Sequence, residues 1–475
     1  MSALPIRPRL ADHALVRRHV IDGAEIVVIH DSRTGDLLRM GPREWDLVAG
    51  ADGTRDFDAL VLAAARRGAL RRASEVRAVL DYLHAAGLLA DGLGYPPPAE
   101  AVDPARPLDV LSAYALTCDG SGDCCSMYGS VIFTPLEAAR ARAIRPEVLG
   151  AGDREERAFT PDRGSLPVIG GADGALAVAL VDGRCAYLAD DRRCSIHVAA
   201  GEMAKPRGCR IYPASFVDDG EVVRVSVGAE CPCVLASVGR EGGAPLVDPG
   251  ARTRADLGPA RIAMLPDVIP ITAAAGVPRA AFVAWSRAVA GCLPEVADGA
   301  ADALGIAWSL AAAVDAHGLD ATAAQAAVGA PRSPEGAELA PLLDALVARA
   351  RARIASADAW RGAQDRSRRA SHWIAAAAER LLDPAARAAF LADGGRYRQD
   401  EIFFLRAQIH GHQLAGEIPV AAALRDRAVR LLLSRALPDA LPEGDPARPH
   451  PLALVEAMMR GHGLAAYARA AREAG

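Results

Sequence analysis

Eight of the nine cysteines of this 475-residue chain lie within one stretch of 116 residues. Because a chain of this length buries an adequate core without covalent staples, disulfide bonds are not needed for its stability. The concentration of thiols in one stretch therefore needs an explanation other than the stabilisation of a small fold by disulfide bonds. The eight residues are Cys118, Cys124, Cys125, Cys185, Cys194, Cys209, Cys231 and Cys233.

The cellular compartment determines whether these thiols are expected to form disulfide bonds or to bind metal. Residues Met1 to Leu10 lack a charged segment followed by an apolar run, so we expect no secretory signal and a cytoplasmic protein. The longest apolar stretch, Leu304 to Val314, is about half of the ~20 residues that a bilayer requires, so we expect no membrane contact. In a reducing compartment, clustered cysteines are typically metal ligands or catalytic groups.

The overall charge argues against two classes of partner. The net charge is −5 and the isoelectric point is near 6.2. Neither value is typical of a protein that binds nucleic acid or an anionic membrane surface, so we expect neither.

Residues 1–90 predict a small winged-helix-like module. Glu25–His30 and Asp36–Met40 read as the strands of a hairpin. Three helices are expected after it. Pro42 suits the first turn of one helix, Asp56 is placed to cap Phe57–Arg67, and Ser74 is placed to cap the third.

The rest of the chain predicts a linker and two further domains. Residues 91–108 are rich in proline, residues 109–250 form a cysteine-cluster domain with loops and short strands, and residues 251–475 are helical. The expected fold is therefore α+β and predominantly α. The helical segments expected in the last domain are Arg279–Cys292, Ala301–Ala316, Leu339–Ala355, Ser371–Leu382, Tyr397–Leu414 and Ala421–Ala436.

The cysteine-cluster domain has its own expected elements. A helix is expected near Pro135–Ile144, and strands are expected over Leu176–Val181 and Cys185–Leu188. The glycines of Cys118–Cys125 predict a tight loop that can turn its thiolates toward a common centre.

The cysteine spacing favours an iron–sulfur centre over zinc. Zinc sites usually contain pairs of cysteines separated by two to four residues, and this chain has no C-x2-C pair. Iron–sulfur clusters accept wider spacings, because their thiolates approach from separate loops. A [4Fe–4S] cluster is the expected cofactor, with zinc as the alternative and with disulfides or uncomplexed thiols as a third reading.

The same residues resemble a known family. Cys118-x5-Cys-Cys125, Cys185-x-Tyr-Leu-x5-Cys194, Cys209-Arg-Ile-Tyr-Pro213 and Cys231-Pro232 together are similar to the YkgJ-type cysteine-cluster family, and most closely to its flagellin lysine-N-methylase branch. The resemblance implies metal binding by these seven cysteines and methylation of protein lysines with S-adenosylmethionine. Cys233 is an additional cysteine beside the family pattern, and the clustering of all eight thiols makes it a predicted metal ligand as well. The first 90 residues resemble PqqD-like modules, which implies docking of a protein or peptide substrate.

Several other residues near the block have two readings. Arg210 and Tyr212 are placed to support a bound cofactor, Arg210 through its charge and Tyr212 through a hydrogen bond to sulfur, or simply to form a salt bridge and a packed ring. His197 reads more readily as an exposed or capping residue than as a ligand. His410 and His412, two apart, would point to nearly opposite sides of a helix unless it ends there.

Two classes of function stay open from the residues. One is an iron–sulfur enzyme that modifies a protein or peptide, for which no catalytic residue and no Rossmann-type G-x-G-x-x-G loop can be named. The other is a metal-stabilised binding module without catalysis. A metal- or redox-responsive regulator is a third hypothesis, but it needs DNA contacts that the charge pattern does not indicate.

Overall fold

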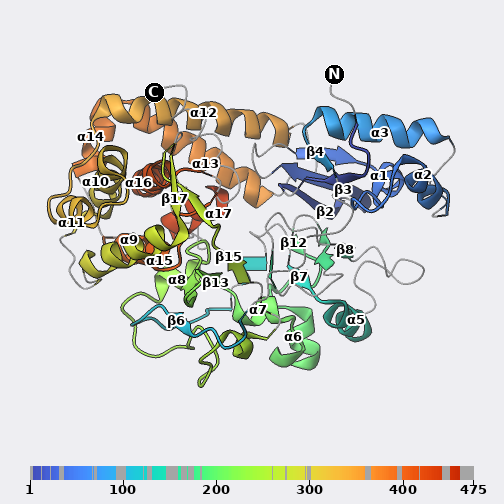
Figure 1. Cartoon of the computed structure of the whole chain (residues 1–475), viewed down its shortest axis with the longest axis horizontal. Coiled ribbons are helices and arrows are strands. Elements are labelled where there is room, and N and C mark those ends of the chain that lie inside the picture. The colour runs from blue at the N-terminus through green and yellow to red at the C-terminus, as the bar shows by residue number, and fades with distance from the viewer. Residues whose placement is uncertain are drawn as a thin grey trace. The chain divides into compact units, whose positions relative to one another are not determined.

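The computed structural model contains two compact units that each draw on two parts of the chain (Figure 1). Unit 1 consists of Met1–Val102 and Tyr128–Arg210, and unit 2 of Asp103–Met127 and Ile211–Gly475. Segment 109–250, predicted as one cysteine-cluster domain, therefore contributes to both. The structure describes residues 4–11, 13–21, 23–31, 37–66, 68, 72–91, 103–120, 122, 124–125, 131–145, 159–161, 168–169, 176–181, 184–258, 260, 262–272, 275–294, 296, 301–358, 365–392, 398–416, 418–440 and 450–459.

Unit 1 is built on a mixed sheet whose strand order is β12-β11-β2-β3-β4. Strands β2 (Ala14–Ile21), β3 (Ala24–Asp31) and β4 (Leu37–Met40) are antiparallel neighbours. The sheet is extended by β11 (Leu180–Val181), which pairs in parallel with β2, and by β12 (Arg184–Cys185). A segment of the cysteine block thus completes a sheet begun near the N-terminus.

Three helices cover the sheet's N-terminal strands and enclose the unit's apolar core. They are α1 (Pro42–Val48), α2 (Phe57–Arg66) and α3 (Ala73–Ala85). Asp56 accepts a hydrogen bond from the Ala59 N–H at 2.9 Å, which confirms it as the cap of α2. The expected cap at Ser74 is wrong, because α3 begins at Ala73 after the extended Arg72, which leaves Ser74 inside the helix.

The remaining elements of unit 1 are short. Strands β1 (Pro8–Leu10) and β5 (Leu89–Asp91) pair with each other, and β10 (Leu176–Val178) lies between β7 (Ile132–Phe133) and β8 (Phe159–Pro161). The single strand expected over Leu176–Val181 is therefore two strands, which join different sheets. The other elements are β9 (Val168–Ile169), α5 (Pro135–Ile144), α6 (Ser195–Ala200), the 3-10 turn η2 (Glu202–Ala204) and α7 (Arg207–Ile211), whose last residue belongs to unit 2.

Unit 2 contains a sheet with the neighbouring strands β6 (Leu108–Val110), β14 (Val223–Val227), β13 (Ala214–Asp218) and β15 (Ile262–Met264). Every residue of β14 is buried, as expected for a central strand. The predicted linker ends here, because Leu108 is the first residue of β6; residues 92–102 lie outside the described residues. A second pair consists of β16 (Val268–Pro270) and β17 (Gly276–Pro278), and the short α8 (Pro232–Ala236) and η3 (Arg254–Leu257) complete this part.

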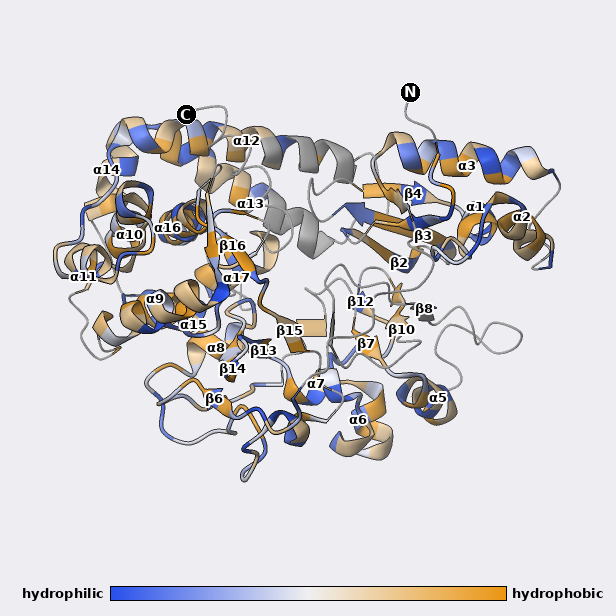
Figure 2. Ribbon diagram, viewed as in Figure 1, coloured by the Kyte–Doolittle hydropathy of each residue, from blue (hydrophilic) through white to orange (hydrophobic). Residues whose placement is uncertain are grey.

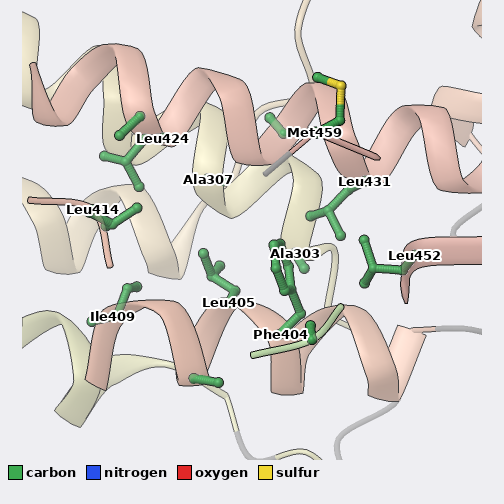
Figure 3. Close-up of a cluster of buried hydrophobic side chains, with 14 of the residues drawn as sticks. Ala303, Ala307, Phe404, Leu405, Ile409, Leu414, Leu424, Leu431, Leu452 and Met459 are labelled. Carbon is green, nitrogen blue, oxygen red and sulfur yellow. The ribbon is translucent and has the colours of Figure 1, made fainter. Parts of the chain in front are cut away.

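Helices make up the rest of unit 2, so the α+β, predominantly α class expected from the sequence is confirmed. The apolar core at their centre contains side chains of α10, α15, α16 and α17 (Figure 3). None of the described helices is both long enough and apolar enough to cross a bilayer. The helices are α9 (Arg279–Cys292), α10 (Ala303–His317), α11 (Ala321–Gly329), α12 (Gly336–Asp358), α13 (Asp365–Leu382), α14 (Pro384–Ala392), α15 (Arg398–His410), α16 (Val420–Ala436) and α17 (Pro451–Met459), with η5 (Leu437–Ala440) after α16.

Every residue of helix α16 except the half-buried Arg425 is buried, including the charged Asp426, Arg427, Arg430 and Arg435. The Arg435 guanidinium contacts Glu401 at 2.7 Å and Asp302 at 2.9 Å, and Arg430 contacts Glu456 at 3.0 Å. Buried charges are tolerated only when they are paired, so these contacts explain how a helix that carries four arginines occupies the centre of unit 2.

Candidate metal centre

Unit 2 brings three potential metal ligands together at one point. The Sγ atoms of Cys118 and Cys233 and a carboxylate oxygen of Asp119 all lie within 4.8 Å of one another. The Cys233 thiol donates a hydrogen bond to Asp119 Oδ1 at 3.2 Å. Cys233 is buried, whereas Cys118 and Asp119 are exposed, so the group lies at the surface with one side open to solvent.

Helix α8 carries the buried part of this group. Cys231 is its N-cap residue, Pro232 occupies the first helical position, where its missing N–H costs nothing, and Cys233 follows in the first turn. The thiols of Cys231 and Cys233 are close enough to hydrogen-bond. The structure thus places three of the predicted ligands in one neighbourhood, namely Cys118, Cys231 and Cys233.

Backbone pairing holds the exposed loop against α8. Leu116 and Ala244 exchange two hydrogen bonds of 2.8 Å, and the Thr117 N–H donates to the Ser237 hydroxyl at 2.9 Å. The same hydroxyl donates to the Cys233 carbonyl at 2.6 Å. Ser237 therefore connects the segment that precedes Cys118 directly to α8, the helix that carries Cys233.

The pKa values of the Cys118 and Cys233 thiols are raised in this group. A hydrogen bond with Cys233, together with burial, raises the pKa of the Cys118 thiol. For Cys233, the hydrogen bond with Cys118 lowers the pKa, but the hydrogen bond with Cys231 and burial outweigh it and raise the pKa to about 12. Adjacent groups of like charge resist joint ionisation. Such a group of thiols and a carboxylate fits a bound cation, whose charge would allow all of them to ionise.

Cys124 and Cys125 form a second pair in the same segment of unit 2. Their Sγ atoms are 3.9 Å apart, and both residues are half-buried. The Cys125 N–H donates to the Gly122 carbonyl at 3.1 Å, and Gly122 has a φ of +68°, which glycine adopts without strain. The tight loop expected from the glycines around these cysteines is therefore present at Gly122.

Cys185, Cys194 and Cys209 belong to unit 1. Cys185 ends β12, and the Leu188 N–H donates to its carbonyl at 2.9 Å, so the strand expected over Cys185–Leu188 stops at its first residue and becomes a turn. The backbone of Leu188 then pairs with Cys194, the N-cap residue of α6. A single tight loop thus carries two predicted ligands, Cys185 and Cys194, and Cys209 lies on α7.

The residues predicted to support a cofactor are placed as follows. Arg210 lies on α7 with Nη1 3.2 Å from the Met203 sulfur, and Tyr212 packs against the core of unit 2. His197 is exposed on α6, as its more ordinary reading expected. The cofactor role of Arg210 and Tyr212 stays a prediction.

His410 and His412 in the C-terminal domain were expected to point to nearly opposite sides of a helix unless the helix ends there, and the helix does end there. Helix α15 ends at His410, and His412 has a φ of +51°. His410 Nε2 lies 3.2 Å from the Asp109 carbonyl oxygen, and His412 Nε2 lies 3.1 Å from a carboxylate oxygen of the buried Asp219. Their ring nitrogens thus connect the end of α15 to the sheet of unit 2.

Sequence reasoning missed Asp119, Tyr114 and Ser237. Asp119 follows Cys118 directly, and a carboxylate beside a cysteine ligand was a signal that could have found it. Tyr114 donates a hydrogen bond to the Val234 carbonyl at 3.1 Å, and burial raises the pKa of its hydroxyl. Nothing local in the sequence indicated Tyr114 or Ser237, because their partners are about 120 residues away.

Comparisons of the chain with protein-family models, with curated proteins and with solved structures found no significant match.

Proposed function

We propose that this chain is a metal-binding protein in which Cys118, Asp119 and Cys233 hold a metal ion. The observation that carries the proposal is the convergence of two thiols and a carboxylate within 4.8 Å. These donors come from two segments more than 100 residues apart, so their meeting is not a consequence of sequence proximity.

The donor spacing favours a single ion at this point. Ligands about 2.3 Å from one tetrahedral zinc lie about 3.8 Å from each other, which is within the 4.8 Å limit that the donor atoms of Cys118, Asp119 and Cys233 satisfy. In a [4Fe–4S] cluster each thiolate binds a different iron, so the sulfurs stand farther apart. We therefore propose zinc or one iron ion at Cys118, Asp119 and Cys233. The [4Fe–4S] centre stays a prediction for the cysteine block as a whole.

The activity we propose is modification of a protein or peptide, with lysine N-methylation as the specific reaction. It is supported by the resemblance of the cysteine pattern to the flagellin lysine-N-methylase branch, and by the one open side of the donor group, because catalytic metal sites keep a position for a substrate or water. A bound ion would supply positive charge there. The chain's own contribution would be to hold the Cys118 loop against α8 through Ser237.

Metal analysis of the anaerobically purified full chain tests the proposal. We expect one zinc or iron per chain at this site, and we expect Cys233→Ser to lose that equivalent while Cys292→Ser, outside the block, keeps it. Because Cys233 is buried, Cys118→Ser at the exposed edge serves as a second variant whose folding is less at risk. Unchanged metal content in both site variants would exclude these ligands. Loss of about four irons and four sulfides together would show a cluster instead of a single ion.

Calorimetry with S-adenosylmethionine tests the activity separately. Binding to the metal-replete protein would support the methyltransferase. If the protein holds its metal but does not bind S-adenosylmethionine, the alternative function, a metal-stabilised module that binds a protein or peptide without catalysis, is favoured.

A further inference from the structure

Unit 1 exposes three large apolar side chains on adjoining elements. Leu136 on α5 is 70% exposed, Val198 on α6 is 57% exposed and Met203 on η2 is 70% exposed. Helices α5 and α6 are neighbours in Figures 1 and 2. Because α6 also packs on η2, the three residues lie on adjoining elements. A group of exposed apolar side chains is uncommon on a surface that contacts only water.

The elements around these side chains are basic, although the chain as a whole carries a net charge of −5. Segments 135–145 and 202–211 contain two carboxylates. The carboxylate of Glu137 is already engaged, because its oxygens accept hydrogen bonds from the N–H groups of Thr134 at 2.8 Å and Arg207 at 2.7 Å. Glu202 is the other. The basic residues of segments 135–145 and 202–211 are Arg140, Arg142, Arg145, Lys205, Arg207 and Arg210, and they include the only lysine of the chain.

Hydrogen bonds keep this face in one arrangement. Thr134 and Glu137 form a capping box at the start of α5, and the hydrogen bond that the Arg207 N–H donates to Glu137 attaches α7 to the same turn. Arg210 Nη1 lies 3.2 Å from the Met203 sulfur, which places a positive charge directly beside an exposed apolar side chain. Apolar contacts and positive charge are thus offered together by a preorganised surface.

We propose that this face, defined by Leu136, Val198, Met203, Arg140, Lys205 and Arg210, docks an acidic segment of a partner protein that also carries apolar side chains. The positive charges of this face favour an acidic partner by charge complementarity. The exposed aliphatic side chains favour a protein over a nucleic acid, because interfaces with nucleic acids are polar and strongly basic. A membrane surface fits less well, since the face contains no tryptophan or phenylalanine to enter a lipid interface. The proposal extends beyond the proposed metal function and does not depend on it.

Fluorescence anisotropy with the full chain tests the docking face. The probe is a labelled helix-forming peptide of about 16 residues with leucine on one face and glutamate on the other, and its counterpart carries lysine in place of glutamate. We expect the acidic peptide to bind at least about tenfold more tightly than the basic one, and its affinity to fall with added salt. We also expect Met203→Glu and Arg140→Glu each to weaken its binding by about tenfold or more.

The matched control is Leu62→Glu, which changes another exposed leucine of unit 1, on α2. It should bind the acidic peptide as the unchanged protein does. Equal binding of the two peptides, or equal weakening by the Leu62 and Met203 variants, would overturn the proposal. Tighter binding to a single-stranded oligonucleotide or to phosphatidylserine vesicles than to the acidic peptide would also overturn it, in favour of nucleic acid or of a membrane surface.

Discussion

His19 is a single side chain whose ionisation depends on the folded state. Burial lowers its pKa to about 4, and the nearby Arg17 and Arg39 act in the same direction. It lies on β2 at the position where β11 pairs with that strand, since its backbone partner is Leu180. The imidazole is therefore kept neutral at the junction between the N-terminal hairpin and the cysteine block.

This pKa shift makes stability depend on pH in a defined window. An unfolded histidine has a pKa near 6.5, so between about pH 6.5 and pH 4 the unfolded chain binds a proton that the folded chain does not. The stability that neutral His19 provides is complete above pH 6.5 and is lost as the pH falls to 4. The loss in the free energy of unfolding is at most about 3 kcal/mol, and solvent screening reduces this value.

Urea unfolding at several pH values measures this dependence. We expect His19→Gln to flatten the pH dependence of the free energy of unfolding between pH 6.5 and 4, and the exposed His197→Gln to leave it unchanged. An unaltered pH dependence in the His19 variant would contradict the assignment.

At the scale of elements, the candidate metal centre depends on how segments pair. Cys118 is held near α8 because Leu116 pairs with Ala244, and this pairing needs the close approach of Gly243. A Cβ at Gly243 would lie 2.8 Å from the Leu116 carbonyl oxygen, closer than real side chains come. The adjacent Gly242 also has a positive φ, but a Cβ there would meet nothing within 4 Å.

These two glycines allow backbone strain to be separated from steric contact. Both Gly242→Ala and Gly243→Ala place a side chain at positive φ, and each should lose about 1 kcal/mol of stability from that alone. Only Gly243→Ala should also push Leu116 away and weaken metal binding, because it displaces the segment that leads to Cys118. Titration with Zn²⁺ in competition with a chromophoric chelator would measure the difference, and equal zinc affinities would show that the pairing does not position the ligand.

At the scale of the whole molecule, the chain builds separate apolar cores. One lies among α1, α2, α3 and the hairpin of unit 1, and the other extends through the sheet and helices of unit 2. Because each core buries its own side chains, damage to one is expected to loosen the unit that contains it more than the other.

Hydrogen exchange followed by mass spectrometry can test this separation. We expect Leu60→Ala, at a fully buried position of α2, to cost about 2–5 kcal/mol and to speed amide exchange in residues 8–91. Residues 303–459 should exchange at their original rate. The exposed Leu62→Ala on the same helix should change neither region, since exposed substitutions usually cost less than about 0.5 kcal/mol. Equal acceleration in both regions would indicate one cooperative unit.

Helical periodicity and capping residues determined most of the local structure. Arg279–Cys292 and Pro135–Ile144 were predicted with the bounds that α9 and α5 have, because apolar spacing and an initial proline act within a few residues. Helices α11, α14 and α17 were not predicted, since alanine-rich or short segments show no clear apolar stripe. Ser74 was misassigned because several residues near a helix start can cap it, and only the backbone decides which one does.

The sequence by itself determined that this protein concentrates its thiols and separates a helical region from them. Only the tertiary structure decided that Cys118 and Asp119 meet Cys233, and that Cys185, Cys194 and Cys209 belong to the other unit. The physical reason is the range of the interactions. Turns and helix caps are encoded within a few residues, whereas the site depends on pairings such as Leu116 with Ala244 and Thr117 with Ser237, which become favourable only when the sheet and helices of unit 2 have packed.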